Sequence, residues 1–126
     1  MIVFDSYAWI EYFAGTKKGE IVKGIIKSQE EILTPSVCIA EIKRKYLREN
    51  KEYKSRIKFI TMRSKIIKID LNISSIAADL SYEKKLYMID AIVYACAIFT
   101  KTEILTGDRH FKNFKNSIHG LLNDFS

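Results

Sequence analysis

The stretch "YMIDAIVYACAIF", residues 87–99, decides the fold class of this chain. Nearly every side chain from Ala91 to Phe99 is apolar, which predicts a helix that is buried on most of its sides. The run "EILT" at 103–106 follows after a short gap and is typical of a buried strand. A buried helix that leads into a buried strand is the repeating unit of α/β proteins, so we expect an α/β fold.

The same alternation of strand and helix extends over the rest of the chain. Three further apolar runs predict strands: "MIVF" at 1–4, "EILT" at 31–34 and "KIIKI" at 65–69, with an edge strand expected at "SIHGLL", 117–122. The segments between them carry apolar residues at helical spacing and predict helices at 7–13, 17–28, 36–47, 53–60 and 73–86. Because parallel neighbours need a crossover connection, we expect an open parallel sheet.

Short polar side chains mark the expected helix starts. We expect N-caps at Ser6, Thr16 and either Asn72 or Ser74, and Gly15 as the end of the first helix. Asp90 stands at the entrance of the apolar helix, where a lone carboxylate most often serves as an N-cap. That interpretation changes only if other carboxylates converge on the same place.

Composition indicates one globular domain over residues 1–126. Apolar residues make up 48% of the chain and charged residues 29%, so a disordered chain is not indicated. The longest apolar run is too short to span a bilayer, and the N-terminus has no basic lead of the kind found in signal peptides. We therefore expect a cytoplasmic protein. Cys38 and Cys96 lie in apolar surroundings, which predicts free buried thiols and neither a disulfide nor a zinc site.

The positive charge is concentrated in one region. The chain carries a net charge of +6, yet residues 42–65 alone hold ten Lys or Arg against two Glu, a local balance of +8. The remainder of the chain is therefore mildly acidic, at −2. A basic stretch of this kind indicates either a polyanionic partner or a solvated helix face, and charge alone leaves both open.

Four carboxylates map to one edge of the expected sheet. Asp5 directly follows the first strand and Asp108 follows the fourth, so both lie at the carboxyl ends of strands. Glu41 lies early in the helix after the second strand, and Asp90 opens the helix before the fourth. Functional crevices of open parallel sheets form beyond the carboxyl ends of the strands, so we expect the four side chains to converge there.

A cluster of four acids favours a particular kind of ligand. Like charges repel at close range unless a cation holds them together. Oxygen ligands suit Mg²⁺ or Mn²⁺, whereas zinc prefers sulfur or imidazole. The set therefore predicts hard-metal chemistry on phosphate esters.

Four short blocks resemble the PIN-domain ribonucleases, and among them the small VapC-type toxins of toxin–antitoxin pairs. The blocks are "IVFDSYAWIEYF" at 2–13, "SVCIAEI" at 36–42, "MIDAIVYACAI" at 88–98 and "ILTGDRHF" at 104–111. The resemblance implies a three-layer α/β/α sandwich and a metal-dependent endoribonuclease that hydrolyses RNA phosphodiester bonds. It assigns catalysis and the binding of one or two Mg²⁺ or Mn²⁺ ions to Asp5, Glu41, Asp90 and Asp108. It also places the hydroxyls of Ser6 and Thr106 beside these carboxylates, where helix capping and turn formation would explain them equally well.

The resemblance also implies partners: an RNA substrate, a cognate antitoxin whose tail fills the acidic groove, and a second copy in a homodimer. RNA contacts are expected at Lys43, Arg44, Arg48, Arg109 and His110. His110 stands where many relatives carry a further acid or amide, and we favour a non-ligand role for it. Tyr46 and Tyr53 fit either base stacking or hydrophobic packing. Trp9, Tyr12 and Phe13 fit either a docking surface or the core.

Other functions fit the sequence less well. A response-regulator domain would need paired acids after the first strand, and a haloacid-dehalogenase-type phosphatase would need an acid where Tyr7 stands. Nothing marks His110 and His119 as the acid–base pair of a metal-free ribonuclease. The more serious alternative is a PIN-like module that binds RNA or protein without cutting. We expect Asp5→Asn or Asp90→Asn to abolish function only in the enzyme.

Overall fold

The computed structural model describes residues 1–106, which alternate between strands and helices. In chain order the elements are β1 (Ile2–Phe4), α1 (Ser6–Ala14), α2 (Lys17–Ile26), β2 (Ile32–Pro35), α3 (Ser36–Arg48), α4 (Lys54–Arg63), β3 (Lys65–Ile67), α5 (Leu71–Lys84), α6 (Met88–Thr100) and β4 (Glu103–Leu105). The elements expected from the sequence within this range are therefore present. The edge strand expected at 117–122 lies outside the described residues.

The four strands form a parallel sheet in the order β3-β2-β1-β4. The first strand lies inside the sheet, where Ile2 pairs with Ile32 of β2 and Phe4 pairs with Leu105 of β4. The expectation of a parallel sheet is confirmed. Because β1 and β4 are neighbours, residues that follow these two strands come together although the sequence separates them widely.

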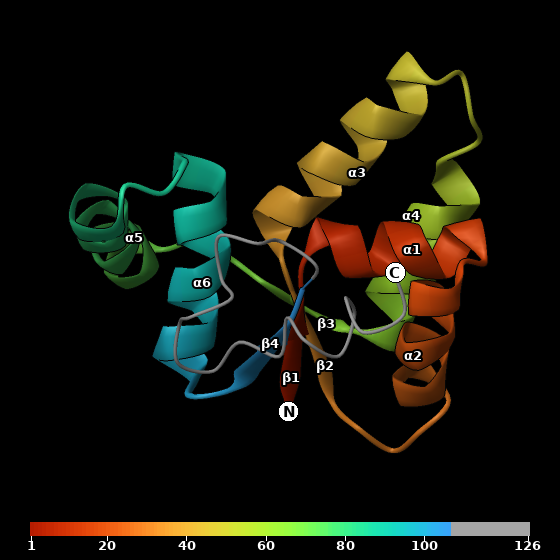
Figure 1. Ribbon diagram of the computed structural model, residues 1–126, viewed down its shortest axis with the longest axis horizontal. Helices are drawn as coiled ribbons and strands as arrows, with labels where there is room; N and C mark the ends of the chain where they lie inside the picture. The colour runs from red at the N-terminus through yellow and green to blue at the C-terminus, as the bar shows by residue number, and fades with distance from the viewer. Residues whose placement is uncertain (107–126) are drawn as a thin grey trace.

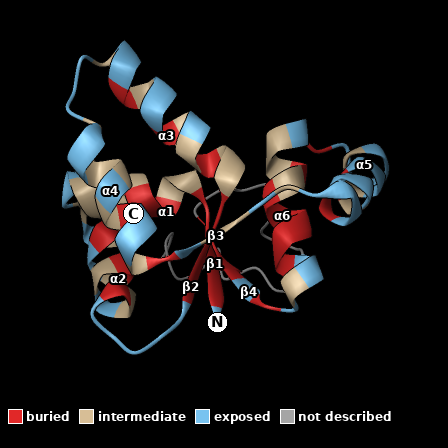
Figure 2. Ribbon diagram, turned by 180° about the vertical axis from the view of Figure 1, so that it is seen from behind, coloured by how far each residue is buried: buried red, intermediate tan, exposed pale blue. Residues whose placement is uncertain are grey.

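Helices cover both faces of the sheet, as the sandwich prediction requires (Figure 1). On one face α5 and α6 pack over a core that includes Val3, Cys96 and Ile104, and on the other α1, α2 and α4 surround a core that includes Phe4 and Trp9. Figure 2 shows buried residues along β1, β2 and β4 and on the inner side of α6. The three-layer α/β/α architecture is thus confirmed, and no helix within residues 1–106 has the length and apolarity needed to cross a membrane.

Helix starts differ from the sequence-based expectation at three places. Asp5, not Ser6, caps α1, because β1 ends at Phe4 and Ser6 is already helical. Asp70 caps α5 by accepting from the amide of Ile73 at 2.9 Å, so neither Asn72 nor Ser74 is the cap.

The third difference concerns α6. This helix begins at Met88 after extended Tyr87, which places Asp90 inside the first turn and not at the cap position. The Asp90 carboxylate is still stabilised by the helix dipole, because it lies in the first turn of α6.

The other expectations about helix ends are confirmed. Thr16 caps α2, and Gly15 ends α1 in the left-handed conformation at φ 68°.

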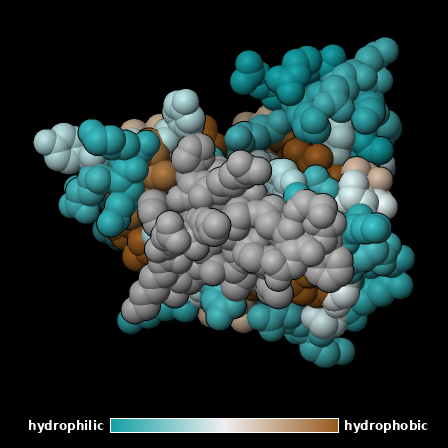
Figure 3. Space-filling view, viewed as in Figure 1, coloured by the Kyte–Doolittle hydropathy of each residue, from teal (hydrophilic) through white to brown (hydrophobic). Residues whose placement is uncertain are grey.

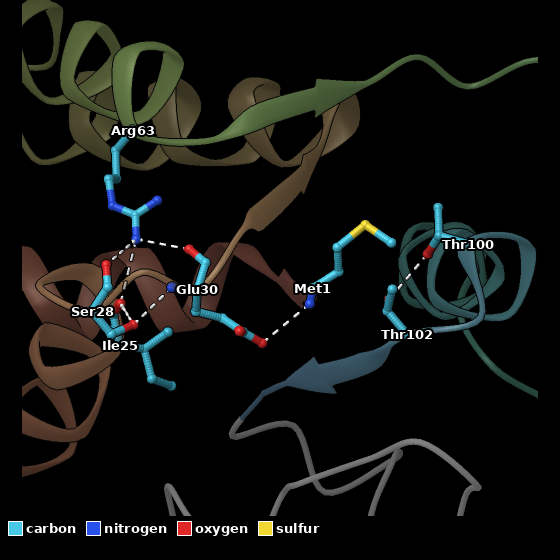
Figure 4. A network of polar contacts seen from close by, with 7 residues as sticks. All are labelled: Met1, Ile25, Ser28, Glu30, Arg63, Thr100 and Thr102. Atoms are coloured by element: carbon cyan, nitrogen blue, oxygen red, sulfur yellow. Dashed lines mark hydrogen bonds and ion pairs between the residues drawn. The ribbon is translucent and has the colours of Figure 1, made fainter.

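Two polar networks anchor α4. At its C-terminal end, Arg63 donates to the carbonyl oxygens of Ser28 and Glu30 at 3.3 and 2.9 Å, which ties α4 to the connection before β2 (Figure 4). Deeper in the core, the indole of Trp9 donates to Thr34 Oγ1 at 3.1 Å, and Thr34 in turn bonds with Ser64 at 2.8 Å. The second network joins α1, β2 and the end of α4 through buried hydrogen bonds.

Candidate active site

Asp5 is a buried carboxylate at the carboxyl end of β1. Only 6% of the residue is exposed, and its Oδ1 accepts a hydrogen bond from the amide of Ala8 at 2.8 Å. The free N–H groups at the start of α1 and the helix dipole both stabilise negative charge at this position. The junction of β1 and α1 therefore fixes the position of the carboxylate.

Thr106 reaches the same carboxylate from the other end of the described chain. Pairing of Phe4 with Leu105 brings the residues that follow β1 and β4 side by side. The hydroxyl of Thr106, which is completely buried, donates to Oδ2 of Asp5. Both oxygens of Asp5 thus have a donor, and each oxygen retains further accepting capacity.

Glu41 is connected to this junction through Ser6. It lies in the second turn of α3, is half-buried, and accepts a hydrogen bond from Ser6 Oγ to Oε1 at 3.0 Å. Since Ser6 follows Asp5 directly, the contact places the second acid beside the first. The Ser6 hydroxyl links the start of α1 to α3 and orients Glu41.

The environment of Cys38 supports the convergence of Asp5 and Glu41. This thiol is fully buried, as expected, and burial raises its pKa well above the usual value. The negative charges of Asp5 and Glu41 raise the pKa of Cys38 further, so both carboxylates lie near the sulfur. The thiol is therefore protonated at neutral pH.

Asp90 lies at the same edge of the sheet, in the first turn of α6. The residue is half-buried, and α6 packs against β1, β4 and α3. Figure 1 shows α6 beginning at the edge where β1 ends and α3 starts. Three of the four acids expected at the site are therefore carried to one edge, whereas Asp108, Arg109 and His110 lie outside the described residues.

The donor set at this edge fits a hard cation by its chemistry. It consists of carboxylates on Asp5, Glu41 and Asp90 and hydroxyls on Ser6 and Thr106, and oxygen donors of this kind suit Mg²⁺ or Mn²⁺. Within residues 1–106, no three Asp, Glu, His or Cys side chains are grouped closely enough to hold a metal ion by themselves. The remaining expected carboxylate, Asp108, belongs to the part of the chain beyond that range.

The basic residues of α3 continue outward from Glu41. Arg44 and Arg48 are exposed and lie three and seven positions after Glu41, on the same side of the helix. Lys43 is also exposed, and its ammonium lies 5.1 Å from the centre of the Tyr53 ring. Figure 3 shows hydrophilic side chains gathered over the outer end of α3, which projects from the body of the molecule. A positive surface therefore starts at the acidic edge and extends away from it.

The sequence left several aromatic side chains open between core packing and contact with a partner, and the structure distinguishes these roles. Tyr46 is 3% exposed, and its ring is covered by Arg56 at 4.5 Å, so it belongs to the core and not to a stacking surface. Trp9 is likewise completely buried. Tyr12 and Phe13, in contrast, line an open hollow, so the expected docking surface retains only these two of its three residues from α1.

Two adjoining hollows lie between α1 and α4, and besides Tyr12 and Phe13 their walls include Arg56 and Phe59, which the sequence did not single out. The larger has a volume of about 470 Å³ between α1, α2 and α4, and Tyr12 and Phe59 stack in its wall with ring centres 5.7 Å apart. The smaller, about 180 Å³, lies between α1 and the α3–α4 segment. Phe13 and Arg56 line both hollows. Only the packing of α4 on α1 creates this surface, so no local signal in the sequence predicts it.

Comparisons with known proteins agree with this architecture. The sequence profile of the PIN domain matches residues 2–116, and no curated protein matches the chain in sequence. A chain of a toxin–antitoxin complex from Klebsiella pneumoniae superposes with a TM-score of 0.78 at 20% identity, covering 94% of this chain and 96% of that one. VapBC2 from Rickettsia felis, solved with a DNA fragment from its promoter, superposes with a TM-score of 0.74 at 17% identity, covering 94% of this chain and 96% of that one. VapC20 from Mycobacterium tuberculosis, a toxin that cleaves the sarcin–ricin loop, superposes with a TM-score of 0.68 at 15% identity, covering 92% of this chain and 98% of that one.

Proposed function

Because this chain belongs to the PIN domain family, we propose that it is a metal-dependent endoribonuclease and the toxin of a toxin–antitoxin pair. The observation that carries the proposal is the junction of β1, α1 and α3, where Asp5 is buried and Ser6 connects it to Glu41. The structural neighbours include a toxin–antitoxin complex and a toxin that cleaves the sarcin–ricin loop, and both support the toxin assignment. A buried acid held by two donors at the carboxyl end of a parallel strand fits catalysis better than structural capping alone.

In the proposed site, Asp5, Glu41, Asp90 and Asp108 hold one or two Mg²⁺ or Mn²⁺ ions. Such an ion, when bound, lowers the pKa of a coordinated water and neutralises charge on the scissile phosphate. Thr106 and the start of α1 hold the Asp5 carboxylate in place. Ser6 holds Glu41, which is then oriented to complete the metal shell or to position the attacking water.

The surface of α3 supplies the approach of the RNA. Arg44 and Arg48 continue from Glu41 along the helix, and Lys43 adds a third exposed cation. Contacts between these side chains and phosphates give affinity that does not depend on sequence and that weakens with salt. Arg109 and His110 stay predicted RNA contacts in the part of the chain beyond residue 106.

The two hollows between α1 and α4 supply a surface for the antitoxin. Phe13 lies between them, and Tyr12 and Phe59 offer an aromatic wall to an apolar side chain. Arg56 lies 5.9 Å from the centre of the Phe13 ring and presents a cation to the same region. Buried aromatic residues beside an arginine are typical of the centres of protein interfaces. A homodimer and a cytoplasmic location stay predictions.

The experiment that tests the proposal is RNA cleavage by the purified chain with Mg²⁺, Mn²⁺ or EDTA. Asp90→Asn is assayed beside it, and Asp79→Asn serves as the matched control, because Asp79 is an exposed acid on α5. We expect cleavage that requires the metal, disappears in Asp90→Asn and is unchanged in Asp79→Asn. Cleavage in EDTA, or equal cleavage by Asp90→Asn, would contradict the proposed site. RNA binding without cleavage under any condition would favour the non-cleaving module.

A further inference from the structure

A chain of hydrogen bonds crosses the core beneath the acidic edge. The indole N–H of Trp9 on α1 donates to Thr34 Oγ1 on β2 at 3.1 Å, and Thr34 Oγ1 lies 2.8 Å from Ser64 Oγ at the end of α4. Ser64 Oγ in turn donates to the carbonyl oxygen of Ile60 at 2.7 Å. Trp9 and Thr34 are completely buried and Ser64 is 9% exposed, so these bonds are shielded from water.

The direction of each bond in this chain follows from the groups themselves. An indole nitrogen can only donate, and the one proton of the Ser64 hydroxyl is already given to a carbonyl oxygen. The Thr34 hydroxyl must therefore donate to Ser64 while it accepts from Trp9. Since only one direction is possible, removing the Thr34 hydroxyl leaves the buried indole N–H of Trp9 without its acceptor.

The position of Thr34 relates this chain to the two acids of the site. Strands β1 and β2 pair in parallel, and continuing their register sets Phe4 opposite Thr34. Each strand then passes into its helix through a single cap residue, Asp5 for α1 and Pro35 for α3. Because neither junction contains a loop, a bond that fixes α1 against β2 also fixes α1 against the start of α3.

Helix α1 is therefore held at two levels. At the acidic edge, Ser6 donates to Glu41 of α3 at 3.0 Å. One turn further along α1, Trp9 is bonded to Thr34 and packs edge-on against the ring of Phe4, with ring centres 5.0 Å apart. Two contacts a turn apart resist a tilt of α1 that a single contact would allow. The lower contact thus helps to keep the Ser6 hydroxyl within reach of Glu41.

We propose that Trp9 and Thr34 are positioning residues for the proposed ribonuclease reaction. Their hydrogen bond keeps α1 at the angle at which Ser6 can hold Glu41. The inference rests on the proposed function and adds two buried residues that lie beneath the site. A bond with a merely structural role would stabilise the fold and leave the reaction unchanged. The other end of the chain provides that comparison, because Ser64 belongs to neither of the helices that carry Ser6 and Glu41.

The experiment compares Thr34→Val, Thr34→Ser and Ser64→Ala in steady-state cleavage of RNA with Mn²⁺, at a temperature well below the melting temperature of each variant. Thr34→Val keeps a similar shape and removes the hydroxyl, so we expect kcat to fall about tenfold with KM for RNA unchanged. Thr34→Ser keeps an acceptor for the indole and should retain most of kcat. Ser64→Ala keeps the bond between Trp9 and Thr34, so it should lower the melting temperature without lowering kcat.

Two further variants keep the test decisive. Should Thr34→Val fail to fold, Trp9→Phe removes the donor, keeps an aromatic ring on Phe4, and is expected to give the same fall in kcat. In a Ser6→Ala background, Thr34→Val should lower kcat no further, because the contact through which it acts is already absent. A full additional loss in that background would contradict an effect through Ser6.

Two readouts do not depend on cleavage. Trp9 is the sole tryptophan of the chain, so its indole N–H gives a single NMR signal. We expect this proton to exchange slowly with solvent in the wild type and in Ser64→Ala, and faster in Thr34→Val. Calorimetric titration with Mn²⁺ in the absence of RNA should show about tenfold weaker binding to Thr34→Val and unchanged binding to Ser64→Ala.

The outcomes separate this inference from the proposed function. If the wild type cleaves RNA and Thr34→Val lowers the melting temperature but neither kcat nor the affinity for Mn²⁺, the bond is structural only. The inference then falls and the nuclease stands. An equal loss of kcat in Ser64→Ala would also overturn it, because that variant keeps the bond between Trp9 and Thr34. If the wild type cleaves no RNA under any condition, both fall.

Discussion

The acidic edge and the basic arm formed by α3 and α4 use charge in opposite ways. At the edge, Asp5 is buried, and each of its oxygens has a protein donor before any ligand arrives. On the arm, Arg44 and Arg48 extend into solvent. A fixed, desolvated carboxylate interacts strongly with a bound cation, whereas an exposed arginine interacts weakly with any single phosphate.

In the proposed function, that difference assigns the reaction to the acidic edge and the attraction of the RNA to the basic arm. Precise geometry is concentrated where the backbone of β1, β4 and α1 fixes the side chains. Attraction is distributed along a helix that projects from the body, where the exact position of each cation matters less. Substitutions at the edge should therefore have large effects confined to the reaction, and substitutions on the arm should have small effects that depend on salt or on the partner.

Asp5→Asn is expected to have the largest effect. Asparagine can still cap α1 and accept from the Ala8 amide, so the fold persists, but the charge that would hold the metal is lost. Cleavage should fall by a factor on the order of a thousand. The control is Asp70→Asn, the same change at the cap of α5. Circular dichroism should match the wild type for both, and full activity of Asp5→Asn would remove this carboxylate from the mechanism.

Arg56→Ala tests the arm as a protein-binding surface. The guanidinium packs over Tyr46 and Phe13 and lines both hollows, so its loss should weaken antitoxin binding by about 2 kcal/mol. Uninhibited RNA cleavage should change little, because Arg56 is not part of the acidic edge. Calorimetric titration of the two proteins measures the effect, with the exposed neighbour Lys58→Ala as control. Equal affinities for the wild type and Arg56→Ala would place the antitoxin elsewhere.

Ser6→Ala asks whether Glu41 needs its hydrogen bond. Without the hydroxyl, Glu41 loses the donor at 3.0 Å, and cleavage should fall by about 10- to 100-fold, as is usual for groups that orient a ligand. The metal concentration for half-maximal activity should rise. Ser6→Thr keeps a hydroxyl and should recover most of the activity. If alanine and threonine behave alike, the contact is structural.

Arg44→Gln and Arg48→Gln should have the smallest effects, visible mainly in their dependence on salt. Each cation that contacts a phosphate contributes about one unit to the slope of log affinity against log salt, so each substitution should lower that slope by about one. KM should rise a few-fold at low salt while kcat stays constant. Lys27→Gln, an exposed cation after α2, is the control. Unchanged slopes in both variants would mean that the RNA does not follow α3.

The sequence predicts the fold better than it predicts surfaces. Strands at Ile2–Phe4 and Glu103–Leu105 are recognisable because buried strands are short apolar runs, and their parallel pairing follows from the helices between them. The pattern also places Asp5 and Thr106 at strand ends, which is enough to expect them on one edge. Exact caps are harder to predict, since a shift of one residue decides between Asp5 and Ser6.

Surface features that depend on how helices pack against one another are not predictable from local patterns. Tyr46 and Tyr82 both lie on helices with mixed faces, yet one is in the core and the other is almost fully exposed. The hollow beside Phe59 exists only because α4 packs at a particular angle on α1, and no residue spacing encodes that angle. Asp90 is an intermediate case. The sequence predicts the edge of the sheet to which it belongs, but not its position inside the first turn of α6.

The hydrogen bond between Thr106 and Asp5 joins residues 101 positions apart, and this has a consequence for synthesis on the ribosome. At about 5–20 residues per second, the first strand waits roughly 5–20 s for β4 to be made. During that interval the nascent chain carries Asp5 without the strand that completes its surroundings. The surroundings of Asp5 therefore cannot be complete until the chain has been translated past residue 106.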